Sequence, residues 1–466
     1  MLKENSISSK FENFLLIFIM LQPILDLLTA FCIMVLKIDT TIGILTRLFV
    51  MGLGGIYIVF QARKRGNLKY LLYIIGMGAF FTIGLINNKL VKDPIVLGEE
   101  IKFIAKSLYP FIMFTCYILV FKSLKENRHF KMRNNIAYAA LIINVVMVVS
   151  VVTGTDYNSY DWLKVGSRGW FYAGNELGSI LAIICPIVVL YSIEKTTSMS
   201  KIYCWIPSIL IIFSLFAVGT KVGFGAIFAT MIIAFIMCFI QAFMQRKDTK
   251  KNAYVLNGMI AMTVFLGVMA YTPFSPFMKN MGLHFQVIEK QQNEKKEENA
   301  KQVEELKEHK PHVIETEKEK EIEIEKEQKE ETKAIIFSGR ELFEQQYKEY
   351  YEKAPLSQKI LGMGYSGNYK GEPKLIERDF HDWFYSFGIG GLGLLLLPFV
   401  YFGLKIIRLV LTKFKQLFTV KYVLVMTGIG LALGISFIAG HVLMAPGVSF
   451  YLALISAYLL VDLEIE

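Results

Sequence analysis

The stretch Ile376-Glu-Arg-Asp-Phe-His-Asp-Trp-Phe-Tyr-Ser-Phe-Gly-Ile-Gly-Gly-Leu-Gly393 stands where a long charged segment ends and a long apolar segment begins. If the apolar segment crosses a membrane, the charged side chains before it lie at the boundary between water and lipid. A histidine beside carboxylates and an arginine at that depth is able to transfer protons on a substrate that is part lipid and part polar. The alternative interpretation is an ordinary helix end, with Trp383 and Tyr385 among interfacial aromatic residues.

The composition excludes a soluble enzyme. The chain has 466 residues, of which 54% are hydrophobic, and a mean hydropathy of +0.45. Apolar runs of about 20 residues recur along it, and each is long enough to cross a hydrocarbon layer of about 30 Å. No small-residue cleavage site follows the first run, which therefore indicates a retained helix and not a signal peptide. The expected fold is an all-α, polytopic membrane helical bundle.

The charge pattern tests the number of helices. Every second connection between apolar runs is rich in lysine and arginine, as the positive-inside rule requires of cytoplasmic loops. This alternation places both termini in the cytoplasm. It is consistent with twelve membrane helices at residues 14–36, 42–60, 68–86, 103–121, 136–153, 174–193, 202–219, 222–244, 254–272, 383–404, 421–440 and 445–462.

The chain divides into three parts on this basis. Residues 1–272 hold the first nine helices, 273–382 form one long extracytoplasmic loop between helices nine and ten, and 383–466 hold the last three helices. A Glu/Lys-rich tract at 289–333 interrupts the loop. Low aromatic content and dense charge are typical of a solvated single helix or a disordered spacer, so we expect the tract to carry no chemistry.

Metal and cofactor chemistry has no support in the sequence. The five cysteines lie within apolar runs without the spacing of metal ligands, which is typical of buried structural cysteines. A phosphate-binding loop of the Walker type is also missing from the sequence, which disfavours ATP-driven transport. The net charge is +10, and most of the excess lysines and arginines lie in short loops between apolar runs. This pattern indicates how the helices are oriented in the membrane and does not indicate binding of nucleic acid. No metal and no cofactor are expected.

Several charged residues fall at the less basic, outer ends of the expected helices. Ionisable groups within or beside a membrane helix are costly and tend to be functional. A set of arginines and lysines at one interface suits a diphosphate anion, because arginine forms bidentate pairs with phosphate oxygens. The alternative is that each residue separately caps a helix or extends to water. The set comprises Arg47, Arg168, Lys221, Arg340, Arg378, His381 and His441, with Asn175, Glu176 and Glu341 close by in sequence.

Four segments of the chain resemble the O-antigen ligase and O-antigen polymerase superfamily of membrane glycosyltransferases. The resemblance rests on the order and topological placement of short motifs and covers most of the chain. Three features depart from the family pattern: Lys221 where an arginine is usual, Asp382 where an asparagine is usual, and the Glu/Lys-rich insertion. The motifs are Arg168-Gly-Trp-Phe-Tyr-Ala-Gly-Asn175, Thr220-Lys221, Ser338-Gly-Arg340 with Leu361-Gly-Met-Gly-Tyr365, and His381-Asp-Trp-Phe followed by Gly388 and Gly391.

The resemblance implies metal-independent transfer of a glycan from undecaprenyl diphosphate to a sugar hydroxyl, on the outer face of a bacterial plasma membrane. The acceptor would be a second lipid-linked glycan or another surface carrier. His381 would take the proton of the acceptor, oriented by Asp379 or Asp382. The cations would stabilise the charge on the leaving diphosphate. In this interpretation Arg168, Lys221 and Arg340 stabilise that charge, Arg378 and Arg47 hold outer phosphate oxygens, Glu341, Glu176 and Asn175 position the cations, and His441 serves in packing or capping.

Other functions stay open at this point. Polymerase and ligase share one chemistry and differ in the acceptor; the Lys-, Ile- and Asn-rich composition suggests a low-GC bacterium and favours a capsule-type polymerase. A lipid-linked oligosaccharide flippase or secondary transporter is the main alternative, although an internal repeat is missing and the polar residues gather at one face. A third interpretation is a non-catalytic scaffold that binds other envelope polysaccharide assembly proteins through the tract at 289–333.

Overall fold

The computed structural model describes residues 2–38, 41–64, 66–124, 127–160, 163–245, 251–283, 285–286, 340–368 and 375–465. Within these ranges the chain is helical apart from loops and one isolated bridge between Asn158 and Ser167. Twelve helices are long and apolar enough to cross a membrane, which confirms the expected number. The Glu/Lys-rich tract at 289–333 lies outside the described residues.

The membrane helices extend further than their apolar runs, and several begin or end with charged turns. Two shorter helices, α12 (Arg340–Lys353) and α13 (Leu356–Leu361), precede the long helix α14 (Asp379–Leu417). The remaining elements are α1 (Leu2–Ala30), η1 (Phe31–Val35), α2 (Ile42–Gln61), α3 (Leu68–Val91), α4 (Leu97–Leu124), α5 (Arg128–Thr153), α6 (Gly174–Lys195), η3 (Met199–Trp205), α7 (Ile206–Val218), α8 (Lys221–Met244), α9 (Lys251–Tyr271), η4 (Thr272–Phe274), α15 (Val420–Ile438) and α16 (Pro446–Ile465).

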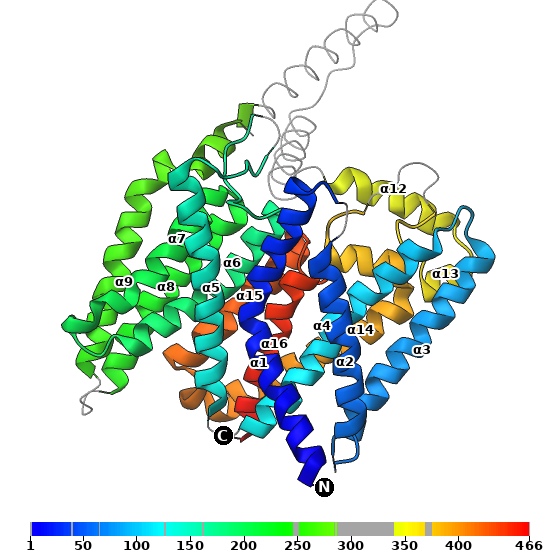
Figure 1. Ribbon diagram of the computed structural model, residues 1–466, viewed down its shortest axis with the longest axis horizontal. Helices are drawn as coiled ribbons and strands as arrows, with labels where there is room; N and C mark the ends of the chain where they lie inside the picture. Colours follow the sequence, from blue (N-terminus) through cyan, green and yellow to red (C-terminus); the bar gives the residue numbers. More distant parts are fainter. Residues whose placement is uncertain are drawn as a thin grey trace, which may run out of the picture.

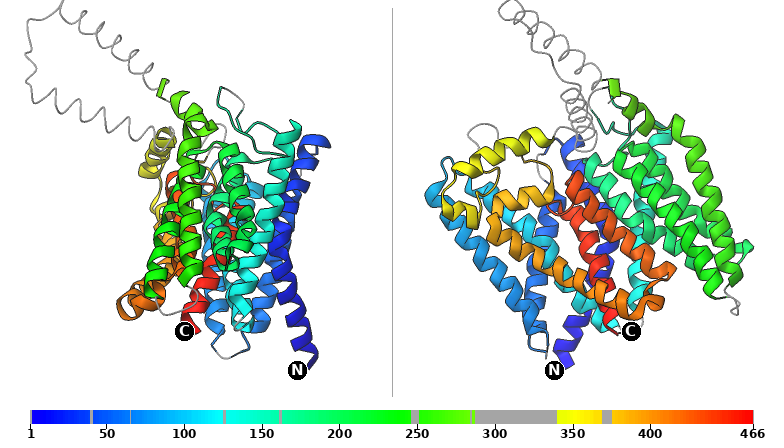
Figure 2. Two further views of the ribbon diagram at one scale, coloured as in Figure 1. Left: turned by 90° about the vertical axis from the view of Figure 1, so that its left-hand side faces the viewer. Right: turned by 180° about the vertical axis from the view of Figure 1, so that it is seen from behind.

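The bundle has a buried centre and two distinct ends. Helices α6 and α16 form the centre of the bundle. The rest of the protein buries 89% of the most apolar segment of α6 and 100% of that of α16. In Figure 2, α16 lies between the green helices α7 to α9 on one side and the blue helices α2 and α3 on the other. Both termini lie at one end of the bundle, whereas α12 and α13 cover the opposite end (Figure 1). We call the latter the α12 end.

Helix α14 is interrupted near its start, and a loop completes it. Gly388 has φ 65° and ψ −174°, a conformation that is essentially restricted to glycine. The interruption deprives the preceding carbonyls of helical partners, and such groups must find other donors inside a membrane protein. The N–H of Met363 donates to the carbonyl of Tyr385 (2.9 Å), and the N–H of Gly364 donates to that of Ser386 (3.0 Å). The Gly-Met-Gly segment therefore replaces the missing helical turn.

The segment is able to do this because two glycines allow the backbones to meet. Gly362 has φ 94° and ψ 157°, and a Cβ atom there would lie 2.0 Å from the carbonyl oxygen of Ser386. A Cβ atom on Gly388 would lie 2.5 Å from the carbonyl oxygen of Ile360. Neither distance is sterically allowed for a side chain. Glycine is therefore required at both positions for the loop to pack against α14.

A buried ion pair holds the loop from the other side. Lys92 and Glu100 lie 2.6 Å apart, with their side chains 6% and 3% exposed. The Glu100 carboxylate accepts the N–H of Tyr365 (2.8 Å), and the Lys92 ammonium donates to the carbonyl of Tyr365 (2.6 Å). Both charges are thereby paired and hydrogen-bonded, as buried ions require. The connection between α3 and α4 thus fixes the loop that completes α14.

Two aromatic side chains in the first two turns of α14 are buried in the protein. Trp383 is fully buried and packs against Phe111 and Phe380, with ring centroids 5.8 and 6.1 Å away. Tyr385 is 6% exposed and packs on Tyr347 of α12. These contacts bury both aromatic side chains against other parts of the protein. Packing on several elements holds this turn of α14 in one orientation.

Substituting Gly362 tests the junction between the loop and α14. We expect Gly362→Ala to destabilise the protein by about 1–3 kcal/mol from the backbone conformation alone, and by more through the contact with Ser386. The measurement is the thermal unfolding midpoint of the purified protein in detergent. The matched control is Gly393→Ala on the same helix, where a Cβ atom has nothing within 4 Å. Equal unfolding midpoints for the two variants would refute the conclusion that the contact of Gly362 with Ser386 stabilises the protein.

Candidate active site

Two buried aspartates fix the backbone around the start of α14. The Asp382 carboxylate accepts the N–H groups of Ile376 (2.9 Å) and Arg378 (3.1 Å). The Asp379 carboxylate accepts the N–H groups of Val442 (2.9 Å) and Leu443 (2.8 Å), which follow α15. The sequence led us to expect one of the two carboxylates to orient His381. The structure uses both to join backbone segments instead.

The partner of His381 is Glu344 of α12. The Nε2 atom of His381 lies 3.3 Å from Oε1 of Glu344, and Nη1 of Arg378 lies 2.6 Å from the other oxygen, Oε2. Arg378 also donates from Nε to the carbonyl of Phe437 (3.3 Å), whose ring packs on His381 at 6.0 Å. The Nδ1 atom of His381 is buried and has no hydrogen-bond partner among the described residues. A carboxylate on one ring nitrogen selects a tautomer and stabilises the imidazolium form.

Sequence reasoning missed Glu344, although a signal was available. Glu344 stands four residues after Arg340 on an amphipathic helix, and residues with this spacing share a helix face. Since Arg340 was selected, its neighbour on the same face was a candidate as well. The neighbouring Glu341, which the sequence did select, belongs to α12 by its backbone, but its side chain lies outside the described part of the structure.

A second carboxylate, Glu377, joins Arg340 to His441. Its Oε2 atom lies 3.3 Å from Nη2 of Arg340 and 3.6 Å from Nε2 of His441. Glu377 and His441 both have a left-handed backbone, with φ 64° and 61°, and a Cβ atom on Gly440 would lie 2.4 Å from the Glu377 carbonyl oxygen. Such strain in non-glycine residues persists only where the surrounding structure enforces it, and it clusters at functional sites. His441 is therefore part of the charged cluster and not only a cap.

Beneath this cluster lies Arg47, which is 3% exposed. Its Nη1 atom lies 2.8 Å from Asp26, and its Nε atom donates to the side chain of Gln22 (2.8 Å). The sequence predicted that Arg47 holds outer phosphate oxygens, but the structure directs these donors to α1. The Glu176 carboxylate lies within electrostatic range of both Arg47 and His441, and so connects the two layers.

The two other predicted cations occupy a neighbouring loop and helix start. Arg168 donates from Nη1 to the carbonyl of Tyr172 (2.6 Å), and Lys221 begins α8 after the Thr220 cap. Lys221 lies near enough to Arg340 for the two positive charges to repel each other. Asn175 is exposed at the start of α6.

The Arg168 loop is pressed onto the turn before α8. The N–H of Ser167 donates to the carbonyl of Ala217 (2.7 Å), and a Cβ atom on Gly166 would lie 2.4 Å from the Val218 carbonyl oxygen. The side-chain amide of Asn280 donates to the carbonyls of both Val165 (2.7 Å) and Gly219 (3.1 Å). The loop with Arg168 and the turn with Lys221 therefore form one unit, and Asn280 is a further residue that sequence reasoning missed.

A family model described as O-antigen ligase like membrane protein matches residues 8–466. The chain belongs to this family. The family expected from the sequence motifs is thereby confirmed. No curated protein and no solved structure matches the chain significantly. Within the described ranges of this O-antigen ligase-like protein, no group of three or more His, Cys, Asp or Glu residues is arranged to hold a metal ion.

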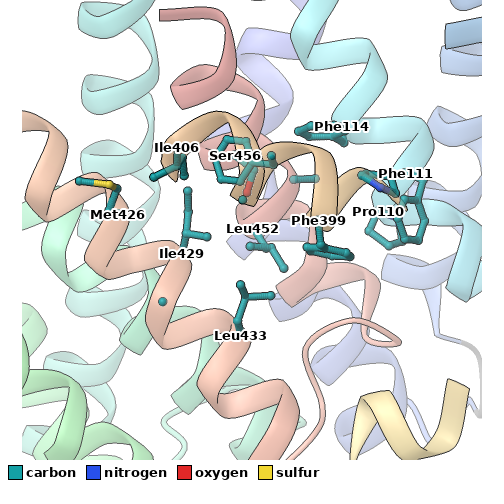
Figure 3. Close-up of a pocket in the computed structure, with 15 residues that line it drawn as sticks. Pro110, Phe111, Phe114, Phe399, Ile406, Met426, Ile429, Leu433, Leu452 and Ser456 are labelled. Atoms are coloured by element: carbon teal, nitrogen blue, oxygen red, sulfur yellow. The ribbon is translucent and has the colours of Figure 1, made fainter. Parts of the chain in front are cut away.

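An apolar cavity of the O-antigen ligase-like protein lies within the helix bundle. It has a volume of about 280 Å³ and lies between α4, α14, α15 and α16, and Ser456 is the only polar residue among those that line it. Figure 3 shows Phe111 and Phe399 together at one side of the cavity, and Phe111 also packs on Trp383. Leu433 lines it one turn before Phe437, the residue that packs on His381. Two residues that line the cavity therefore lie close to Trp383 and Phe437.

The pair of His441 and Glu377 makes a testable contribution to stability. Burial disfavours the imidazolium, but the carboxylate of Glu377, with Asp379 and Glu176 farther away, outweighs this and raises the pKa of His441. A raised pKa adds stability that is complete below about pH 6.5, the value in the unfolded chain, and is lost as the pH rises through the folded-state value. The relevant variant is His441→Asn, because asparagine tolerates the left-handed backbone.

We therefore expect the difference in thermal unfolding midpoint between the wild type and His441→Asn to be largest below about pH 6.5 and to shrink as the pH is raised. Midpoints of both proteins measured in detergent from acid to mildly alkaline pH check this expectation. In Glu377→Gln, the same histidine substitution should show no such pH dependence. A difference that is constant with pH would contradict the ion pair.

Proposed function

We propose that this protein transfers a glycan from undecaprenyl diphosphate to a hydroxyl group of a sugar acceptor on the extracytoplasmic face of a bacterial plasma membrane. The observation that carries the proposal is the contact of His381 and Arg378 with one carboxylate, Glu344. An imidazole and a guanidinium on one carboxylate of α12, a helix at the end of the bundle away from the termini (Figure 1), support a proton acceptor beside a cation. Membership in the O-antigen ligase-like family supports the same class of reaction.

In the proposed reaction the acceptor oxygen attacks the anomeric carbon of the donor glycan. The bond from this carbon to the acceptor oxygen forms, and its bond to the diphosphate oxygen breaks. His381 takes the proton of the acceptor hydroxyl, and Glu344 holds the imidazole and stabilises the resulting imidazolium. The diphosphate leaves with the electron pair of the broken bond. Cations placed before the reaction stabilise this charge more effectively than water, which must reorganise.

Arg340 and Lys221 are the cations that we assign to the diphosphate, and Arg168 stands on the loop packed against the start of α8. Arg378 is engaged by Glu344 and therefore positions the base, with a secondary role at the phosphate. Arg47 pairs with Asp26, so we assign it to the support of the site, together with Glu176, Asp379 and Asp382. Arginine suits this task because it stays charged at low dielectric.

The lipid part of the donor would lie in the apolar cavity between α14 and α15. An isoprenoid chain needs only apolar contacts, and the cavity supplies them next to Trp383 and Phe437. The basic connections at the opposite end favour a cytoplasmic location of both termini and an extracytoplasmic location of the site. We favour a surface-polysaccharide polymerase that works with other envelope assembly proteins, since a second lipid-linked glycan offers the hydroxyl group this chemistry needs.

The central test is the chain length of surface polysaccharide in a host that lacks this gene. Complementation with the wild type should restore long chains, whereas His381→Ala should leave only short or single repeat units, because proton transfer contributes about 10²–10⁴-fold to such reactions. A variant without residues 289–333 should complement, since the tract is assigned no chemistry. The membrane abundance of each variant is measured in parallel.

The same experiment separates the alternatives. Full complementation by His381→Ala at normal abundance would refute the mechanism in which His381 takes the proton of the acceptor, and would favour a flippase or transporter. Loss of function on deletion of 289–333, with His381→Ala active, would favour a scaffold that binds its partners through the tract.

The role of Glu344 is tested by a matched pair of variants on α12. We expect Glu344→Gln to lower the rate of glycan transfer by about 10²-fold, because the amide neither stabilises the imidazolium nor pairs with Arg378. Glu349→Gln removes the same charge from an exposed position of the same helix and should keep the wild-type rate. The measurement is single-turnover transfer by purified protein with a lipid-diphosphate-linked glycan. Equal rates for both variants would remove Glu344 from the mechanism.

A further inference from the structure

A second cavity, which we call the lower cavity, lies at the end of the bundle where the termini meet. It has a volume of about 260 Å³ and opens between α3, α4, α14 and α16. Toward the centre of the membrane its walls are apolar, with Ile118 of α4 and Leu397 of α14. Toward the end of the bundle its walls are polar, with Lys69, Tyr70 and Glu464. The lower cavity therefore has the two-part character of a phospholipid: an apolar channel beneath a charged mouth.

The charge at the mouth is unbalanced. The Glu464 carboxylate lies 2.7 Å from the ammonium of Lys405 and 3.5 Å from that of Lys122, and Lys69 is within electrostatic range. Lys122 also donates to the hydroxyl of Tyr70 (3.0 Å), and Lys69 lies 5.2 Å from the centre of the same ring. Three ammonium groups thus surround one carboxylate. The excess positive charge at the edge of a membrane attracts anions.

The lower cavity adjoins the apolar cavity but is not lined by the charged residues of the candidate active site. The side chains of Phe114 and Pro398 line both the lower cavity and the apolar cavity between α14 and α15. His381 stands at the beginning of α14, whereas Lys405 lies in its second half, beyond Pro398. A ligand in the lower cavity would therefore touch α14 without touching the residues assigned to glycan transfer.

We propose that the lower cavity binds an anionic phospholipid, with one acyl chain between α4 and α14 and the phosphate among Lys69, Lys122 and Lys405. An acyl chain fills the apolar part, which a free inorganic anion would leave empty. A negative headgroup balances the excess charge at the mouth, which a zwitterionic headgroup does not. The bound lipid would pack α14 against α3 and α4, and so brace the helix that carries His381 at its other end.

The test uses the full-length protein purified in detergent, with phosphatidylglycerol and phosphatidylcholine of identical acyl chains as probes. We expect phosphatidylglycerol to bind with higher affinity in native mass spectrometry and to raise the thermal unfolding midpoint more than phosphatidylcholine does. The variant Lys69→Gln/Lys122→Gln/Lys405→Gln should weaken phosphatidylglycerol binding by about tenfold or more, because each lysine near an anionic headgroup contributes about 1 kcal/mol.

The matched control removes the same number of charges at the same end but outside the cavity, as Lys131→Gln/Lys413→Gln/Lys415→Gln; all three residues are exposed. It should keep the affinity of the wild type. Equal weakening in both triple variants would show diffuse attraction of lipid and overturn the site. Equal binding of the two lipids by the wild type would overturn it as well.

A further variant keeps every charge at the mouth and fills the cavity. Ile118→Trp should exclude the acyl chain and lower phosphatidylglycerol binding while the lysines remain in place. Unchanged binding in this variant would overturn the acyl-chain assignment. If the triple lysine variant is too unstable to purify, the result with Ile118→Trp still tests the proposal.

Discussion

The interruption of α14 at Gly388 is the constraint on which the rest of the α12 end depends. A helix that breaks inside a membrane bundle leaves carbonyl groups that water cannot reach, so another part of the chain must supply donors. The N–H groups of Met363 and Gly364 do so, and the ion pair of Lys92 and Glu100 holds them in place. The segment at residues 362–364 is consequently part of the packing of α14. Its fixed position also brings α12 over the start of α14.

Four carboxylates around the start of α14 divide into two kinds. Asp379 and Asp382 accept backbone N–H groups and thereby shape the segments on either side of α14. Glu344 and Glu377 are partly exposed and each meets an arginine and a histidine. The hydrogen bonds of Asp379 and Asp382 are made to backbone N–H groups within the protein. The cations that pair with Glu344 and Glu377 are able to bind a substrate anion that competes with these carboxylates. Only the second kind of carboxylate therefore takes part in the proposed chemistry.

Much of this was accessible from the sequence, and the limits have physical causes. The twelve membrane helices followed from apolar runs and alternating basic loops, which are local properties of the chain. The aromatic residues after His381 were harder to place, because burial of Trp383 depends on Phe111, which is distant in the sequence. Pattern alone also suggested Asp379 or Asp382 as the partner of His381, since neighbours in sequence are the visible candidates. The contact with Glu344 comes from another helix.

The fold class, the family and a set of candidate cations were predictable from residue order, because hydropathy, charge alternation and short motifs depend on residue order alone. The folded structure shows how those charges are paired. It assigned Arg47 to Asp26, Arg340 to Glu377, and His381 with Arg378 to Glu344. Each of these pairs joins residues from different segments. The energy of a charge in a bundle depends on the partner within a few ångströms, which packing selects and residue order does not reveal.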